Sequence, residues 1–179
     1  MVMEIESELY APEQMRDLSE VVESLRVGRD AILRDWMDRV RDNAAIRTGD
    51  GLTDPLLLDH LPQLFDAILD RLDINRPRED AEKFAAVHGF TRRISGYDIL
   101  ESVIELLIFR HAIWAHLIAI RAPAAATLPV MERIDGMVDR AVISSLKAYL
   151  DPGAKMLARR RPIESLPFDG APPEDGAGG

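Results

Sequence analysis

Residues 97–121 read YDILESVIELLIFRHAIWAHLIAIR, and this stretch decides the fold. It predicts one long helix with apolar side chains on nearly all faces, at Leu100, Val103, Ile104, Leu107, Ile108, Trp114, Leu117 and Ile118. Because a helix that is apolar all round is normally buried, we expect it at the centre of the core or at a subunit interface. A membrane span needs about 20 predominantly apolar residues. The stretch is interrupted by Glu105, Arg110, His111 and His116, so we expect no membrane insertion.

On both sides of this stretch, proline and glycine divide the chain into segments that are long enough for helices and lack the alternating pattern of strands. Apolar spacing predicts further helices over about 12–27, 29–44, 55–72 and 79–94, and a last helix that has Pro129 early in it and stops near 151. Pro62 lies inside the third of these, and because proline removes a backbone donor we expect a kink or a restart there. The sequence therefore predicts an all-α bundle of about six helices.

Composition narrows the class of protein. The chain has 179 residues, with 22 basic and 31 acidic side chains, a net charge of −9 and no cysteine. This balance argues against a nucleic-acid binder, and the missing cysteines exclude disulfides and cysteine-based metal sites or nucleophiles. Residues 1–11 are acidic and lack the features of a secretory signal, so we expect a flexible N-terminus, a helical domain over 12–152, a disordered tail over 153–179 and a cytoplasmic location.

Four histidines are the natural candidates for acid–base or metal chemistry. His111 and His116 are five residues apart, so on a helix they point away from each other and do not form a metal-binding pair. No nucleophile, base and orienting group stand in a recognised pattern. We therefore expect no enzymatic activity, metal or cofactor. Two alternatives stay open: histidine phosphotransfer through His88, and a haem- or chromophore-binding globin using His88 or His111.

Polar groups inside the apolar helix indicate a candidate site. Glu105 and Arg110 fall where burial is expected, and buried charges need partners. His88 and Arg92 are four residues apart on the preceding helix and project from one face. The predicted cluster comprises His88, Arg92, Tyr97, Glu105, Arg110 and His111. It is interpreted either as a structural polar network or as a ligand-sensing site.

The order of several short motifs resembles the N-terminal sensor domain of the RsbRD type, found on stressosome co-antagonist proteins and on some bacterial sensor histidine kinases. The resemblance covers about residues 29–150 and rests on Ile32–Trp36 with Arg39–Arg41, Leu52–Pro55, Leu58–Pro62 with Leu64, His88–Gly89 with Arg92 or Arg93, Gly96–Tyr97, and Glu105 with Leu107–Arg110. The resemblance implies a globin-like helical fold without haem, a dimer, and an input module rather than an enzyme.

Family members commonly continue into a phosphorylatable output domain or a kinase core, whereas here a short tail follows the last predicted helix. We therefore expect a sensory or regulatory module of bacterial signal transduction that forms a homodimer through its long apolar helices. Its expected partner is a separate kinase or anti-anti-sigma-type regulator, together with a small-molecule ligand where the cluster senses one. A signal would act by favouring one helix packing over another.

Overall fold

Seven α-helices and one short 3-10 turn make up the regular structure of residues 12–73, 80–121, 123–151 and 153, which are the residues described by the computed structural model. The elements are α2 (Pro12–Val27), α3 (Arg29–Arg41), η1 (Gly49–Gly51), α4 (Asp54–Leu58), α5 (Leu61–Leu72), α6 (Ala81–Ile94), α7 (Ile99–Ala119) and α8 (Ala124–Leu150). No strand occurs in these ranges, so the all-α prediction is confirmed. The predicted flexible ends, 1–11 and 154–179, lie outside the described residues.

The predicted helix over 55–72 is two helices, which accounts for seven elements where about six were expected. α4 ends at Leu58 and α5 begins at Leu61, with Pro62 in its first turn, where the missing proline N–H leaves no intrahelical bond unmade. Asp59 lies between them with a φ of 45°, a conformation rare for a residue with a side chain. The expected restart at Pro62 is therefore confirmed, and the turn itself is made at Asp59.

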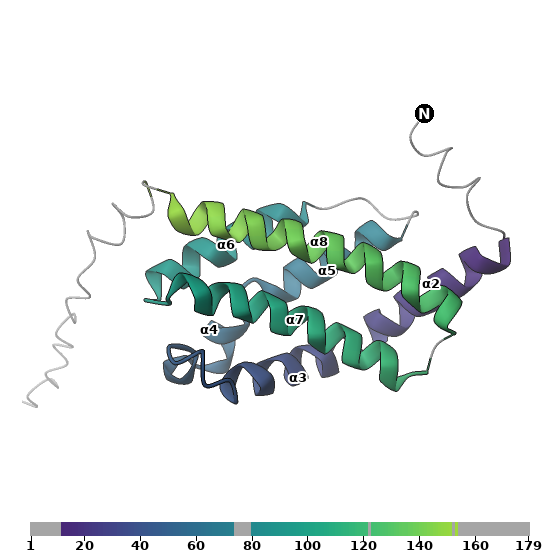
Figure 1. Cartoon of the computed structure of the whole chain (residues 1–179), viewed down its shortest axis with the longest axis horizontal. Coiled ribbons are helices and arrows are strands. Elements are labelled where there is room, and N and C mark those ends of the chain that lie inside the picture. The colour runs from purple at the N-terminus through teal and green to yellow at the C-terminus, as the bar shows by residue number, and fades with distance from the viewer. Residues whose placement is uncertain (1–11, 74–79, 122, 152, 154–179) are drawn as a thin grey trace, which may run out of the picture.

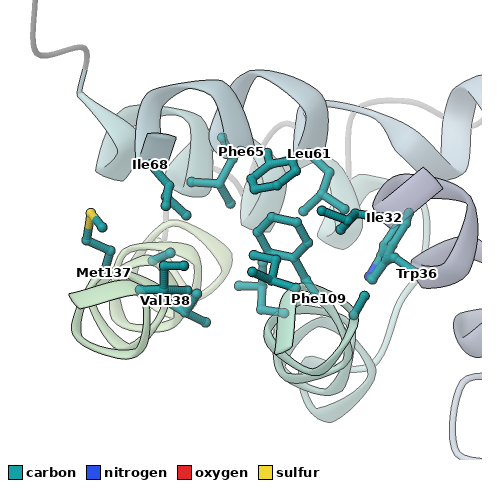
Figure 2. Close-up of a cluster of buried hydrophobic side chains, with 14 of the residues drawn as sticks. Ile32, Trp36, Leu61, Phe65, Ile68, Phe109, Met137 and Val138 are labelled. Atoms are coloured by element: carbon teal, nitrogen blue, oxygen red, sulfur yellow. The ribbon is translucent and has the colours of Figure 1, made fainter. Parts of the chain in front are cut away.

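The helices pack as a bundle in which α7 and α8 run side by side in opposite directions (Figure 1). α6 packs along α8, α3 packs along α7, and α5 packs on α6. Figure 2 shows the apolar interior between α5, α7, α8 and α3, where the rings of Phe65 and Phe109 meet edge to face at 5.3 Å. Trp36 on α3 is fully buried, and its indole N–H donates to the Glu105 carbonyl of α7 at 3.0 Å.

A close approach between α6 and α8 requires glycine at position 89. A Cβ atom built there would lie 2.1 Å from the backbone carbonyl oxygen of Ser145 on α8. Any larger residue would push the two helices apart, so Gly89 fixes their separation. His88, the preceding residue, is held inside the bundle by the same contact.

α7 has the length and apolar composition of a membrane span, and no other helix in the described part of the chain does. Core helices of soluble proteins pass the same test, and α7 packs against α3 and α8 with Glu105 fully buried. One side of this helix therefore lies in the core, which is one of the two placements that the sequence left open. One side of α7, including Leu100 and Ile118, remains exposed.

Candidate functional site

Four of the predicted site residues form a buried polar cluster between α4, α6 and α7. His88 and Arg92 lie one turn apart on α6, Glu105 projects from α7, and Tyr97 follows α6 in the turn toward α7. The side chains of His88, Arg92 and Glu105 have no exposed surface. A fifth residue, Asp59, enters from the turn between α4 and α5 with 8% of its side chain exposed. We call these five residues the buried polar cluster.

Arg92 connects the three helices. Its Nε donates to Glu105 Oε2 at 2.6 Å, and its two terminal nitrogens donate to the carbonyls of Leu56, at 3.1 Å, and Leu57. These carbonyls belong to the C-terminal end of α4, where backbone acceptors lack intrahelical partners and a positive charge is favourable. Arg92 therefore caps α4 while it neutralises the carboxylate on α7.

His88 lies between two carboxylates. Its Nε2 is 3.3 Å from Glu105 Oε2, and its Nδ1 is 3.7 Å from Asp59 Oδ2. Burial by itself lowers the pKa of His88, but the contacts with Asp59 and Glu105 outweigh it, and the pKa is raised. Burial likewise raises the pKa of Asp59, but the contact with His88 and the charges of His60 and Arg92 together outweigh it, so that pKa is lowered. The arrangement therefore favours a protonated imidazole between two ionised carboxylates.

Several polar atoms of the cluster are buried without a hydrogen bond. They are Asp59 Oδ2, both ring nitrogens of His88, the Tyr97 hydroxyl and Glu105 Oε1. His88 and Asp59 thus interact by charge rather than through a short hydrogen bond. Unmatched buried polar groups cost free energy, so this part of the bundle responds to changes in charge more sensitively than a satisfied network would.

Tyr97 joins the cluster to the last helix. The guanidinium of Arg92 lies 4.9 Å from the centre of the Tyr97 ring, and burial raises the pKa of the Tyr97 hydroxyl. The Tyr97 carbonyl accepts a hydrogen bond of 2.6 Å from the hydroxyl of Tyr149, near the C-terminal end of α8. One residue therefore contacts the cluster with its ring and α8 with its backbone.

The structure does not bring Arg110 and His111 into the cluster, which corrects the predicted set. Arg110 pairs with Asp139 of α8 at 3.3 Å and lies over the ring of Trp114. His111 is exposed and also contacts Trp114. Because residues five or six positions apart on a helix differ by more than about 100° in direction, both point away from the side that carries Glu105.

Asp59 is the member of the cluster that the sequence analysis missed. It was part of a motif that carried the resemblance, but its contact with His88 depends on the tight turn before Pro62. The neighbouring His60 contacts the other oxygen of Asp59 at 2.6 Å and is partly exposed. The available signal was an Asp-His pair, Asp59-His60, followed by Leu61 and the proline in the first turn of α5.

The geometry of the histidines bears on the two alternative functions, histidine phosphotransfer and haem or chromophore binding. His88 has no exposed surface, so a phosphoryl donor has no access to it in this conformation. Both of its nitrogens face carboxylates, whereas an axial haem ligand must present one nitrogen to the iron. No three His, Asp or Glu side chains within the described ranges are placed to hold a metal ion. The cluster brings two carboxylates, one guanidinium and one imidazole together inside the bundle.

Comparison with known proteins places this geometry in a family. A family model described as the RsbT co-antagonist protein RsbRD N-terminal domain matches residues 30–162, well over half of the chain and all five residues of the buried polar cluster. Neither the curated proteins nor the solved structures yield a match. The resemblance drawn from the motifs is confirmed by this match. The chain belongs to the RsbT co-antagonist protein RsbRD N-terminal domain family, a family of stress-signalling regulatory domains.

Proposed function

We propose that the chain is a non-enzymatic sensory module of bacterial stress signalling that acts in the cytoplasm, forms a homodimer and docks a separate signalling partner. The family supports the signalling role. The observation that carries the dimer is an apolar surface on α7 and α8, which we call the α7–α8 face. It comprises exposed or half-exposed side chains at Leu100, Leu107, Ile118, Leu128, Val142, Ile143, Leu146 and Leu150.

The α7–α8 face has the form of an interface between copies. Leu100 and Ile118 are 67% and 68% exposed at opposite ends of α7, although the helix is otherwise a core element. The two helices run antiparallel (Figure 1), with the Arg110–Asp139 pair between them at mid-length. Monomeric proteins rarely expose long apolar surfaces, and a twofold axis buries the same surface on both copies. A second copy is therefore the occupant that we assign to this face.

Light scattering during size-exclusion chromatography tests the dimer. We expect the full chain to elute at twice its 20.0 kDa mass, and Leu100→Glu with Ile118→Glu to elute as a monomer. Val27→Glu is the control, because Val27 is 79% exposed on α2, a helix that contributes no residue to this face. A wild-type chain that stays monomeric at every concentration would refute the homodimer.

Docking and ligand binding need separate measurements. Native mass spectrometry of the protein purified from its own host reports the subunit number and any retained small molecule together. A dimer without added mass supports a docking module that works through protein contacts. Surface plasmon resonance with purified kinase and anti-anti-sigma-type domains from that host then tests docking. Failure to bind any of them would contradict the docking proposal and leave the dimer result unaffected.

A further inference from the structure

The charges of the buried polar cluster balance when His88 is protonated and both carboxylates are ionised. Asp59 and Glu105 supply two negative charges and Arg92 supplies one positive charge. A protonated His88 completes the balance, whereas a neutral His88 leaves one uncompensated negative charge in the interior. An unpaired buried charge is strongly unfavourable, so loss of this proton must change the packing around Arg92 or draw in water.

The groups that act on the His88 ring come from three elements. Asp59 stands in the α4–α5 turn, Arg92 on α6 and Glu105 on α7. From α8 the neighbour of this part of α6 is Ser145, which is neutral. No ion pair joins His88 to α5 or α8 in the part of the chain that the structure describes. His60 contacts Asp59, and through it forms a second layer around His88.

A chain of contacts leads from this cluster to the end of α8. Arg92 packs on the Tyr97 ring, and its backbone carbonyl accepts a hydrogen bond from the Tyr97 N–H at 3.0 Å. The Tyr97 carbonyl holds the Tyr149 hydroxyl. Tyr149 is held a second time by Arg93, whose guanidinium donates to the Tyr149 carbonyl at 2.9 Å and lies over its ring. Two consecutive arginines of α6 thus serve different purposes, one inside the cluster and one on the last turns of α8.

We propose that the charge of the buried polar cluster controls how firmly the C-terminal end of α8 is held, with Tyr97 as the link between them. When His88 is protonated, Arg92 is shared between Glu105 and the end of α4, and Tyr97 stays in place. When His88 is neutral, Asp59 and Glu105 compete for Arg92. A shift of Arg92 then moves Tyr97, and the hydrogen bond to Tyr149 weakens.

This proposal deepens the proposed signalling function and rests on it. In that function, a change in helix packing inside the bundle would be transmitted out of the domain at the C-terminal end of α8. The physical link stands within a single chain. Light scattering tests the dimer, and the exchange experiment below tests the link. Because residues 142, 143, 146 and 150 also belong to the α7–α8 face, exchange is compared only under conditions in which light scattering gives the same oligomeric state at both pH values, so either one can fail without the other.

Amide hydrogen exchange on the full chain tests the link. Mass spectrometry compares residues 141–150 of α8 with residues 124–137 of the same helix, at about pH 6 and about pH 9, after correction for the intrinsic exchange rate. We expect exchange in 141–150 to be roughly threefold faster at the higher pH, and 124–137 to be unchanged. Tyr149→Phe removes the hydrogen bond and leaves the cluster intact, so its α8 end should exchange fast at both pH values.

Two further variants set the charge of the buried polar cluster without a change of pH. His88→Gln cannot be protonated and should give fast exchange in 141–150 already at the lower pH. His88→Gln with Glu105→Gln restores a neutral cluster, because Asp59 and Arg92 then balance, and should restore slow exchange. Slow exchange in 141–150 of folded His88→Gln would overturn the proposal. If His88→Gln does not fold, a Tyr149→Phe protein that keeps the wild-type exchange rates, or fast exchange in the double variant, overturns it instead.

Discussion

Arg92 and Glu105 form an ion pair with no exposed surface, in which Arg92 Nε donates to Glu105 Oε2 at 2.6 Å. The pair joins α6 to α7, and the same guanidinium caps α4. Three helices, α4, α6 and α7, therefore depend on one buried arginine. Whether the cluster is a structural network or a responsive one depends on what happens when this pair is altered.

Removing one partner of the pair should be severely destabilising. Glu105→Ala leaves a buried guanidinium without its carboxylate, and Arg92→Ala leaves the carboxylate and the end of α4 without a donor. Breaking a buried pair in this way costs about 3–5 kcal/mol. Urea unfolding followed by circular dichroism measures the loss. Arg110→Ala is the control, because its pair with Asp139 is partly exposed and should contribute less than about 1 kcal/mol. If Arg110→Ala lowered the free energy of unfolding as much as Arg92→Ala or Glu105→Ala, a special role for the buried polar cluster would be contradicted.

His88 and Glu105 should not behave independently in a double-mutant cycle. His88→Gln removes the balancing proton and leaves a net negative cluster, whereas Glu105→Gln on top of it removes one negative charge again. The double variant should therefore lose less stability than the two single losses added together, with a coupling energy of about 1–3 kcal/mol for groups in contact. Urea midpoints of the four proteins give this energy. Additive losses would mean that the cluster is held by packing and not by charge balance.

Stability should depend on pH through His88. Its folded-state pKa is raised above the unfolded value of 6.5, so its contribution is fully present below about pH 6.5 and is lost as the pH rises through the folded-state pKa. Asp59 acts on the acid side, because its pKa is lowered: its contribution is present above the unfolded value and is lost as the pH falls through the folded-state value. Urea midpoints across the pH range should therefore fall at both ends.

The His88→Gln variant tests both arms of this profile. It should lose the fall toward high pH, and the fall toward low pH should weaken as well, because the contact with His88 is the largest interaction that lowers the pKa of Asp59. His111→Gln is a matched control, because His111 is exposed and outside the cluster, and it should keep both arms. An alkaline arm that persists in His88→Gln would assign the titration to another group.

Much of the fold was predictable because the helices are amphipathic and separated by proline and glycine. The ends of the helices were less predictable, because side-chain hydrogen bonds to the backbone compete there with the hydrogen bonds of the helix. The helix expected to reach Ala44 ends at Arg41, where the side-chain oxygen of Asn43 accepts the Ala45 backbone N–H at 2.9 Å. α8 begins at Ala124, because three alanines favour helix, and it includes Pro129 near its start as expected.

The candidate site was predictable where its residues share a helix face. His88 and Arg92 are four apart and lie together, as expected. Arg110 was grouped with Glu105 because both interrupt an apolar run, but composition does not give direction around the helix, and their five-residue spacing separates them. Asp59 reaches the cluster only through a backbone turn with positive φ, and no periodicity signals such a turn.

Gly89→Ala should be among the most damaging small substitutions in the chain. The added Cβ would lie 2.1 Å from the Ser145 carbonyl oxygen, and because that atom belongs to the backbone of α8, only a shift of a whole helix relieves the overlap. Such overpacking costs about 1–3 kcal/mol, and the displacement of α6 would move His88 as well. Thermal and urea unfolding of Gly89→Ala give the loss, and Gly51→Ala is the matched control, because nothing lies within 4 Å of its Cβ position. Gly51→Ala should stay within about 0.5 kcal/mol of the wild type. If Gly89→Ala were equally mild, α6 and α8 would not approach each other at Gly89 and Ser145 as closely as the structure places them.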